Sequence, residues 1–461
     1  MHADMHGRDE ISDGRLLDKS GPHKIAVVGT GISGLSAAWL LAQRHDVTVF
    51  EADSRPGGHS RTVRTACADG EAPVDVGFIV YNERTYPNLT ALFAHLGTPT
   101  KASDMSFAVS LDNGAVEYSG TDLAGLLAQK RNLLRPRFWS MMNDLLRFYR
   151  NAPRDLPRLG LMTLGDYLDT NKYGAAFRED HLYPMAAAIW SIPASRAADY
   201  PAAAFVRFCD NHGLLSVANR PIWRTVDGGS RVYVDALCKP LGDRLRVSAP
   251  VRSVIRREGG VFVRANGGQE ERFDHVVIAA HADQALNMLG DASPRERRIL
   301  SAFRYSANSA ILHRDPALMP RRRSVWSSWN YVGARGAPDA QPPVTYWMNR
   351  LQGLPKATPR FVTLNSGRQP REDLIIERHA FTHPIFDSAA IAAQADLWSL
   401  QGRGGVWHCG AYFGAGFHED GLQAGLAVAE ALGGVRRPWR VAEESGRIRI
   451  VPQRLDVGSA A

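Results

Sequence analysis

KIAVVGTGISG, residues 24–34, sets the architecture of the 461-residue chain. Its first five residues form a short apolar run, which is typical of a strand buried on both faces. The run leads directly into a G-x-G-x-x-G motif and then into the Ala/Leu-rich segment 35–43, where we expect a helix. A second apolar strand is expected at residues 47–50, and it ends in Glu51, 22 positions after Gly29. This order of elements predicts a dinucleotide-binding βαβ unit.

Each part of the motif has a physical task. Gly29 makes the tight turn, Gly31 lets the backbone approach a pyrophosphate, and Gly34 lets the helix pack closely on the strand. The helix N-terminus offers N–H groups and the positive end of its dipole to the phosphates. Glu51 can accept hydrogen bonds from ribose hydroxyls, which favours a cofactor without a 2′-phosphate. The alternative, a purely structural glycine turn, leaves Glu51 unexplained.

Composition restricts the class of protein. With 44% hydrophobic and 22% charged residues the chain is globular, and its length suggests two or three units. The net charge of +8 is modest and spread out, and we expect no nucleic-acid partner. Four widely spaced cysteines argue against a disulfide framework and a zinc site. No apolar run approaches the ~20 residues of a membrane span, and the first twenty residues do not read as a signal peptide, so we expect a cytoplasmic protein.

A second glycine pair follows the acid. Residues 55–62 read RPGGHSRT, where the glycines would admit another part of the same cofactor and the two arginines could bind phosphate. Residues 74–79 (VDVGFI) place a further glycine in an apolar strand context. With these motifs the chain resembles the flavin-dependent amine oxidase superfamily, which includes monoamine oxidases, protoporphyrinogen oxidase and phytoene desaturases.

The resemblance continues to the C-terminus through further motifs in the family's order. Three of them are motifs: residues 225–230, before an expected helix at 232–241; residues 406–410; and residues 414–421, before an expected helix at 422–432. The other two are expected strands, at 246–251 and at 273–280. The resemblance implies non-covalent FAD and an α/β fold, in which a Rossmann-like FAD-binding domain of the amine oxidase and glutathione reductase type is interleaved with an α+β substrate domain. The expected division is a flexible leader (1–23), the FAD domain (24–100, 225–285 and 400–435), the substrate domain (101–224 and 286–399) and a tail (436–461).

Residues of these motifs are the candidate FAD contacts. They are Gly29, Gly31, Ile32, Ser33, Gly34, Glu51, Ala52, Arg55, Gly57, Gly58, His59, Arg61, Gly77, Phe78, Ile79, Val251, Gly410, Glu419, Gly421 and Leu422.

Three departures from the family pattern narrow the chemistry. Amine oxidases carry a lysine near flavin N5, but none of the seven lysines falls in residues 306–314, where His313 or Arg314 is the nearest polar group. His418 stands where an aromatic cage residue is expected, and Ala411 replaces the usual acid. Cys409 lies outside the loop that links flavin covalently in relatives, so we interpret it as a small buried residue.

The substrate side is predicted from two segments. Residues 130–158 hold eight basic and two acidic residues and an apolar helical face, which suits an anionic membrane surface, although an ordinary outer helix is the alternative. Residues 181–190 mix small and large apolar side chains, as do Phe205, Phe208 and Trp223, which suits a hydrocarbon pocket; plain core packing is the alternative.

The sequence is most similar to a bacterial branch of predicted NAD/FAD-binding proteins associated with fatty-acid modification. GTGISGLSAAW (29–39) and HCGAYFGAGFHEDGLQAGLAVAEAL (408–432) carry that similarity. It implies hydride transfer between a lipid acyl chain and flavin N5, in desaturation or double-bond isomerisation. The acid/base candidates are His418 and Glu419, followed by Tyr412 and His212. An amine oxidase that makes hydrogen peroxide and a non-catalytic FAD-binding protein are the alternatives.

Overall fold

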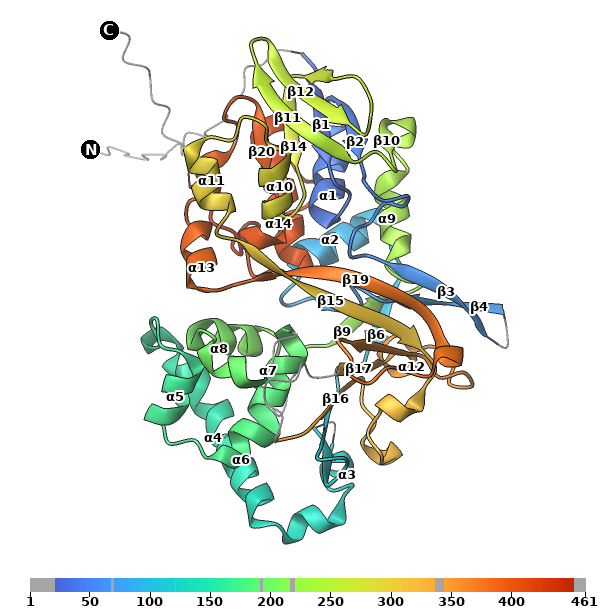
Figure 1. Ribbon diagram of the computed structural model, residues 1–461, viewed down its shortest axis with the longest axis vertical. Helices are drawn as coiled ribbons and strands as arrows, with labels where there is room; N and C mark the ends of the chain where they lie inside the picture. Colours follow the sequence, from blue (N-terminus) through green and yellow to red (C-terminus); the bar gives the residue numbers. More distant parts are fainter. Residues whose placement is uncertain are drawn as a thin grey trace, which may run out of the picture. The chain divides into compact units, whose positions relative to one another are not determined.

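The computed structural model describes residues 21–67, 70–120, 122–190, 194–215, 220–335 and 344–451. The chain divides into two compact units (Figure 1). Unit 1 contains the described parts of residues 1–56, 237–303 and 388–461, and unit 2 contains those of 57–236 and 304–387. Within the described ranges, no helix has both the length and the apolarity needed to cross a bilayer.

Unit 1 is built on a five-stranded sheet in the order β10-β2-β1-β14-β20, and every neighbouring pair is parallel. The strands are β1 (Lys24–Val28), β2 (Asp46–Phe50), β10 (Leu245–Arg246), β14 (His275–Ile278) and β20 (Val406–His408). The last four residues of β1 and of β2 are buried, as the short apolar runs predict. The three-segment parallel sheet confirms the Rossmann-like class.

Two helices pack against each other beside this sheet, α1 (Ile32–Leu41) and α14 (His418–Gly433) (Figure 1). Glycines make the contact close: a Cβ at Gly425 would lie 2.2 Å from the carbonyl oxygen of Ser33, and a Cβ at Gly421 would lie 3.0 Å from Ile32. A Cβ at Gly425 would clash with this backbone oxygen, whereas a Cβ at Gly421 would require the Ile32 side chain to shift by a few tenths of an ångström. The C-terminal helix therefore supports the N-terminal βαβ unit directly.

Further elements of unit 1 include two 3₁₀ helices, at Gly242–Arg244 and Leu397–Leu400. They also include the antiparallel sheet β11 (Val251–Arg257), β12 (Gly260–Ala265) and β13 (Glu271–Phe273), and the helices α10 (Ala282–Met288), α11 (Pro294–Leu300) and α13 (Ser388–Gln394), with a 3₁₀ turn η10 (Ala411–Phe413) before α14.

Unit 2 contains a seven-stranded sheet in the order β19-β15-β18-β17-β16-β7-β8, antiparallel except for the β16–β7 pair. The strands are β7 (Phe107–Leu111), β8 (Val116–Ser119), β15 (Arg304–His313), β16 (Trp329–Gly333), β17 (Val344–Trp347), β18 (Phe361–Leu364) and β19 (Ile375–Ile385). Smaller sheets are formed by β3 (Thr62–Cys67) with β4 (Gly70–Asp75), and by β5 (Tyr81–Asn82), β9 (Trp223–Val226) and β6 (Thr100–Ser103). The long β15–β19 pair dominates the arrangement in Figure 1.

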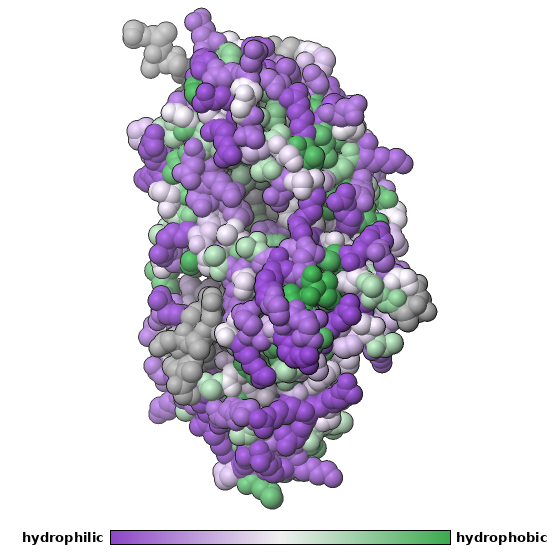
Figure 2. Space-filling view, turned by 45° about the vertical axis from the view of Figure 1, so that its right-hand side comes forward, coloured by the Kyte–Doolittle hydropathy of each residue, from purple (hydrophilic) through white to green (hydrophobic). Residues whose placement is uncertain are grey.

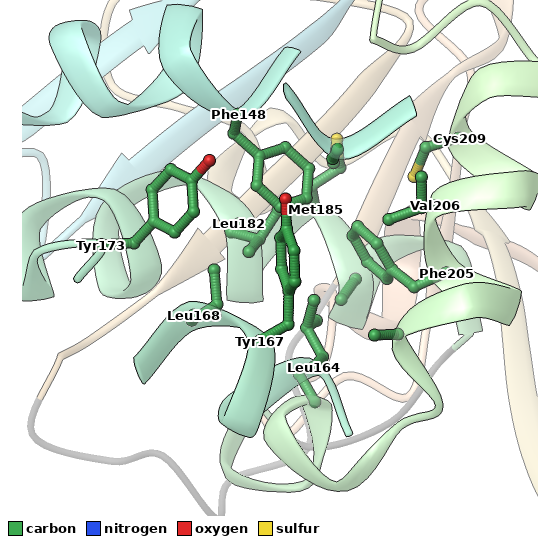
Figure 3. Close-up of a cluster of buried hydrophobic side chains, with 14 of the residues drawn as sticks. Phe148, Leu164, Tyr167, Leu168, Tyr173, Leu182, Met185, Phe205, Val206 and Cys209 are labelled. Atoms are coloured by element: carbon green, nitrogen blue, oxygen red, sulfur yellow. The ribbon is translucent and has the colours of Figure 1, made fainter. Parts of the chain in front are cut away.

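Helices supply the rest of unit 2. They are α2 (Pro87–Leu96), α3 (Leu123–Leu126), α4 (Pro136–Asp155), α5 (Leu164–Thr170), α6 (Ala175–Phe177), α7 (Tyr183–Trp190), α8 (Ala202–Asn211), α9 (Arg231–Cys238), which reaches the boundary with unit 1, and α12 (Met348–Leu351). The helices α4 to α8 enclose an aromatic core around Phe148, whose ring lies 5.4 Å from that of Phe177 (Figure 3). Leu182, Met185 and Ala186 belong to this core.

Segment 181–190 is therefore a core segment over most of its length. Ala187 and Ala188 join two further buried clusters, and only Tyr183 and Ile189 are partly exposed among its large apolar residues that the structure describes; the side chain of Trp190 lies outside the description. Phe205 is buried in the same helical core. These positions favour core packing over the predicted hydrocarbon lining.

Several predicted boundaries are wrong. Residues 246–251 are not one strand, because Ser248 adopts a positive φ of 51° between the end of β10 and the start of β11. Segment 273–280 is split between β13 and β14. Order begins before Lys24, since the backbone N–H of His23 donates to His45 Nδ1. The leader residues 1–20 and tail residues 452–461 lie outside the described ranges.

The division into units also differs from the expected blocks. Residues 57–100 pack with unit 2 because Val63, Val74 and Val76 share a buried cluster with Ala310 and Leu312 of β15. Residues 286–303 and 388–399 fall in unit 1, where α11 contacts α13. Local motifs could not reveal these long-range contacts. The assignment of FAD binding and substrate binding to particular blocks stays a prediction.

Candidate functional site

The first glycine motif has the geometry that a phosphate-binding turn requires. Gly29 has a φ of 101°, and a Cβ there would lie 2.6 Å from the carbonyl oxygen of Ala279. A Cβ at Gly34 would lie 2.0 Å from the carbonyl oxygen of Gly29. Both positions therefore need glycine, one for conformation and close approach and one for packing of α1 on the turn.

Gly31 differs because it faces open space. It is the N-cap of α1, nothing lies within 4 Å of a Cβ built on it, and no side chain among the described residues caps the helix. The first turn of α1, which begins at Ile32 and Ser33, also lacks acidic residues. The N–H groups and the dipole of α1 are thus available for an anion, as a pyrophosphate requires.

Glu51 is buried, and both of its carboxylate oxygens already accept hydrogen bonds. Oε2 accepts from the backbone N–H of Thr30 at 2.9 Å and from the Thr30 hydroxyl, and Oε1 accepts from the N–H of Asp53 at 2.8 Å. A carboxylate offers about four acceptor sites, so these bonds leave room for a ribose hydroxyl at Oε1. Glu51 therefore also orders the turn that carries Gly29 and Gly31. Ala52 is exposed beside it.

The second glycine motif begins where unit 2 begins. Gly57 and Gly58 have φ values of 117° and 54°. The next residue, His59, accepts a 2.9 Å hydrogen bond from the N–H of Phe78 at its carbonyl oxygen, and a Cβ at Gly77 would lie 1.9 Å from that oxygen. Gly77 and Phe78 thus pack against the backbone of His59, whereas the carbonyl of Ile79 accepts a hydrogen bond from Thr225. This role in packing is additional to their predicted contact with FAD.

Arg61 and Arg55 were predicted as phosphate ligands. The guanidinium of Arg61 lies 2.5 Å from Glu377 of β19, so its charge is compensated inside unit 2. Arg55 Nη1 donates weakly, at 3.5 Å, to the carbonyl of Pro56. The phosphate contacts of Arg55 and Arg61 stay predictions.

The start of α9 binds a carboxylate of the protein itself. Asp75 accepts hydrogen bonds from the N–H and hydroxyl of Ser230, from the hydroxyl of Thr62 and from the amide of Gln352. Burial nevertheless raises the pKa of Asp75 to about 6, against the opposing effect of these bonds. The glycine motif at 225–230 thus ends in an internally capped helix.

The C-terminal motif places three of the predicted catalytic residues on two elements that contact each other. Tyr412 lies in η10, and His418 and Glu419 are the first two residues of α14, which contacts η10. Glu419 is fully buried and accepts a 2.9 Å hydrogen bond from Gln423, one turn along the helix. His418 is half-buried. Gly410 precedes η10, and Gly421 and Leu422 lie in the buried part of α14.

Asp420 is a functional candidate that the sequence reasoning missed. Its carboxylate accepts hydrogen bonds from the N–H groups of Phe417 and Ala415 and from Arg447 at 2.6 Å. Burial raises the pKa of Asp420, whereas Arg447 opposes the rise. The sequence signal that could have identified Asp420 is its position as an acidic residue in the first turn of a helix. Asp420 fixes the loop between η10 and α14.

His212 belongs to unit 2, whereas His418 belongs to unit 1. Its ring stacks on Phe208, with centroids 3.9 Å apart, and on Trp223, and its Nδ1 is 2.8 Å from the carbonyl oxygen of Phe208. These contacts describe a buried packing residue. The structure therefore gives no support to His212 as an acid/base group.

His313 is the last residue of β15, and Arg314 follows the strand. The Nε2 of His313 is 2.7 Å from the Thr363 hydroxyl and its Nδ1 accepts from the N–H of Asp315; the ring is buried, and burial lowers its pKa to about 4. Asn308, on the same strand, instead lies 2.9 Å from the ring of His383 on β19. The sequence reasoning did not identify this pair.

Two remaining residues have structural positions. The Cys409 thiol is buried, and burial raises its pKa to about 12. That value makes it a poor nucleophile, in agreement with its interpretation as a small buried residue. Val251 begins β11 and pairs with Ala265. Its predicted contact with FAD stays a prediction.

The donor set of unit 1 fits a flavin dinucleotide. An uncapped helix N-terminus can hold the pyrophosphate, and Glu51 retains acceptor capacity for a ribose. Comparison with known sequences identifies the same cofactor, since the profile of the family described as "Flavin containing amine oxidoreductase" matches residues 32–312.

Two curated proteins and one solved structure illustrate the similarity. The putative flavin-containing monoamine oxidase AofH of Mycobacterium tuberculosis is 31% identical over 266 residues, which cover 55% of this chain and 56% of AofH. Hydroxyneurosporene desaturase of Rubrivivax gelatinosus is 27% identical over 338 residues, which cover 62% of this chain and 60% of the desaturase. The alignments thus span less than two thirds of either relative.

Among solved structures, a CLA-producing fatty acid isomerase from P. acnes shares the fold. It superposes with a TM-score of 0.63 at 15% identity, over 90% of this chain and 98% of the isomerase. Because the family profile covers more than half of the sequence, the chain belongs to the flavin-containing amine oxidoreductase family, and FAD is its cofactor.

Proposed function

We propose that this flavoenzyme transfers hydride between a fatty-acyl chain and the flavin, in desaturation or double-bond isomerisation. When bound, the flavin supplies a hydride acceptor at N5. The observation that carries the proposal is the composition of β15, whose ten residues include no lysine and place the buried Asn308 beside His383. The lysine through which amine oxidases act near N5 has no equivalent on this strand.

The outer surface of α4 supports a lipid substrate. Trp139 and Leu146 are 52% and 51% exposed, and Leu134, just before the helix, is 86% exposed. Arg150 and Arg154 are exposed on the same helix. In Figure 2, an apolar group lies at the lower tip beyond hydrophilic side chains, at the level of the segment between α3 and α4 in Figure 1. Exposed apolar side chains beside arginines suit peripheral binding to an anionic membrane.

The acid/base groups that we propose are His418 and Glu419, with Tyr412 of the adjoining turn η10 as a weaker candidate. All three lie where η10 meets α14, in the motif that resembles the flavin-facing segment of the family. The buried Glu419 shares a hydrogen bond with Gln423, so its carboxyl is held in one orientation. Isomerisation moves a double bond without net oxidation, so the hydride must return from the flavin to the acyl chain. We propose that these residues hold the acyl chain in place until the hydride has returned.

The decisive experiment is anaerobic. The FAD-loaded protein is mixed with unsaturated fatty acids and phospholipids and, in parallel, with benzylamine and a polyamine, while the flavin spectrum is followed and the acyl products are analysed by mass spectrometry. Desaturated or isomerised acyl chains would support the proposal. Rapid flavin reduction by an amine, without any acyl product, would overturn it.

Amine oxidation is the second candidate, because AofH, at 31% identity, is named as a putative monoamine oxidase. Aerobic peroxide formation from amines distinguishes this candidate from acyl chemistry. A protein that binds FAD but changes neither class of substrate would be the non-catalytic alternative.

A further inference from the structure

A surface groove of about 610 Å³ lies at the turn that joins β7 to β8 in unit 2. Its lining consists of residues 112–115 of the turn and three arginines, Arg131, Arg321 and Arg322. Arg131 belongs to the 3₁₀ helix η1 (Lys130–Leu134), which precedes α4, whereas the other two lie between β15 and β16. Two segments that are far apart in the sequence thus bring positive charge to one turn.

The turn holds the arginines through neutral acceptors. Arg131 Nη2 donates to the carbonyl oxygen of Ala115 at 2.8 Å, and Nη1 of Arg135, the N-cap residue of α4, donates to the same oxygen at 2.8 Å. Arg321 Nη2 donates to the side-chain oxygen of Asn113 at 2.5 Å. A guanidinium has five N–H donors, so each of these three arginines keeps donors that the turn does not use.

Two acids close to the groove are already paired. The buried Glu117 accepts a hydrogen bond from Arg322 Nη1 at 2.7 Å, and Asp112 lies 2.6 Å from Arg335. For the three arginines held by the turn, no carboxylate in the described part of the chain lies within ion-pair distance. Their positive charge is therefore uncompensated, and it suits an added anion.

Apolar side chains that face the solvent adjoin these arginines. Leu133 and Leu134 lie in η1, between the two arginines of this segment, and Leu134 is 86% exposed. The half-exposed Trp139 donates its indole N–H to the carbonyl oxygen of Leu133 at 2.8 Å, which joins the tryptophan to η1. Leucines and a tryptophan beside exposed arginines suit the boundary between lipid headgroups and acyl chains. A small soluble anion or a nucleic-acid backbone would leave the leucines uncovered.

We propose that the groove at the β7–β8 turn binds the phosphate of an anionic phospholipid headgroup, with Arg131 and Arg321 as its ligands. The exposed apolar side chains of η1 and α4 then lie in the interfacial layer of the same membrane. Guanidinium forks bind phosphate oxygens through paired N–H···O bonds, so the site recognises a headgroup and not only a negative surface. The inference rests on the proposed function for its choice of a lipid surface, but it concerns binding alone and includes no step of the reaction.

Flotation of the FAD-loaded protein with vesicles measures this binding. The vesicles contain phosphatidylcholine alone, phosphatidylcholine with phosphatidylglycerol, or phosphatidylcholine with cholesteryl hemisuccinate at the same surface potential. We expect binding to the phosphatidylglycerol vesicles and at least about threefold weaker binding to the carboxylate vesicles. Equal binding to both anionic vesicles would overturn the headgroup site. Tighter binding to a duplex oligonucleotide than to any vesicle would assign the arginines to nucleic acid and would also overturn it.

Charge removal in the groove tests the two ligands. Arg131→Gln combined with Arg321→Gln should weaken binding to phosphatidylglycerol vesicles about twentyfold or more, since each arginine near an anionic surface contributes about fivefold. Arg252→Gln combined with Arg264→Gln is the matched control, because both arginines are exposed on β11 and β12 of unit 1 and the net charge falls equally. The control should change the binding by less than about twofold. Equal losses in the two variants would show that only net charge matters and would refute the site.

A conservative variant separates the guanidinium fork from its charge. Arg131→Lys combined with Arg321→Lys keeps both charges, so the fold and the binding to anionic vesicles should persist. The preference for phosphatidylglycerol over cholesteryl hemisuccinate should disappear, because an ammonium group cannot form the paired bonds. A preference equal to that of the wild type would contradict the proposed ligands even if the glutamine variant failed to fold.

The source of the phosphate is tested with a soluble ester. Calorimetric titration with sn-glycerol 3-phosphate, without vesicles, should show binding no tighter than about 1 mM, because the apolar contacts are missing. Micromolar binding that the Arg131→Gln and Arg321→Gln variant loses would assign the groove to a soluble phosphate and overturn the lipid assignment. Acyl products from dispersed fatty acids without vesicle binding would refute this inference and leave the proposed function standing. Vesicle binding with the expected selectivity, but without acyl products, would do the reverse.

Discussion

Replacement of Glu51 by alanine should weaken both the fold of unit 1 and its hold on FAD. In the protein without FAD, the substitution leaves the buried N–H of Thr30 and the half-buried N–H of Asp53 without their acceptors. A buried unsatisfied donor costs about 1–3 kcal/mol, with the Asp53 group near the lower end, so the free energy of unfolding should fall by about 2–4 kcal/mol. Urea unfolding of the apo-protein measures this loss.

The loss of FAD affinity is a separate quantity. A hydrogen bond from a ribose hydroxyl to a carboxylate is worth about 1.5–3 kcal/mol, which corresponds to a roughly tenfold to hundredfold weaker complex. Titration of the apo-protein with FAD, followed by flavin fluorescence, gives the dissociation constant. The titration is done without denaturant, under conditions in which the variant is folded. Asp46→Ala is the matched control, since Asp46 is an exposed acid at the start of the same strand.

The two measurements can contradict the reasoning separately. Unchanged stability of the apo-variant would show that the Thr30 and Asp53 hydrogen bonds carry no weight. Reduced stability with FAD affinity within twofold of the wild type would show that Glu51 orders the turn and does not bind the ribose.

Three further predictions concern other parts of the molecule. Gly425→Ala should lower the free energy of unfolding by about 3 kcal/mol or more, because its Cβ would lie 2.2 Å from the carbonyl oxygen of Ser33. Urea unfolding measures this loss, and a change below about 0.5 kcal/mol would contradict the close contact. Burial lowers the pKa of His408 to about 4, so the contribution of the neutral ring to stability is present above pH ~6.5 and is lost as the pH falls toward about 4. His408→Met should therefore remove up to about 3 kcal/mol of the acid-induced destabilisation. Unfolding curves of the variant with the same pH dependence as those of the wild type would refute this prediction. Leu134→Glu combined with Trp139→Glu should reduce co-sedimentation with anionic vesicles roughly tenfold or more, while the FAD content stays constant. Undiminished co-sedimentation would exclude this surface as the membrane-binding surface.

Local pattern was sufficient to predict the strands, the glycine turn and the first helix of unit 1. The apolar runs of β1 and β2, the glycine spacing and the acid at Glu51 lie within 28 residues, so period and spacing define them without any knowledge of distant contacts. The class of fold and the cofactor followed from this stretch and from the resemblance of later motifs, and both are confirmed.

Contacts between distant segments could not be predicted in this way. The alternation of Glu377, His379 and His383 is visible in the sequence, but its partners His59 and Asn308 are separated from His383 by 324 and 75 positions. The same limit explains why the sequence left both a hydrocarbon pocket and core packing open for residues 181–190: apolar composition is the same in a core and in a cavity. The internal partners of Glu51 and Asp75 were also hidden, because a single sequence does not show which donors a buried acid meets.

The glycine-mediated contact between α1 and α14 has a consequence for biosynthesis. The two helices are separated by more than 370 positions, and β20, which forms one edge of the parallel sheet, precedes α14 by only ten. A ribosome therefore releases the N-terminal βαβ unit long before the helix that shields it has been made. Contacts of such high sequence separation slow folding and leave apolar surface uncovered in the interval. We expect the nascent chain to depend on chaperone protection until residue 433 has left the ribosome, and a chain truncated before α14 to aggregate even though its glycine motif is intact.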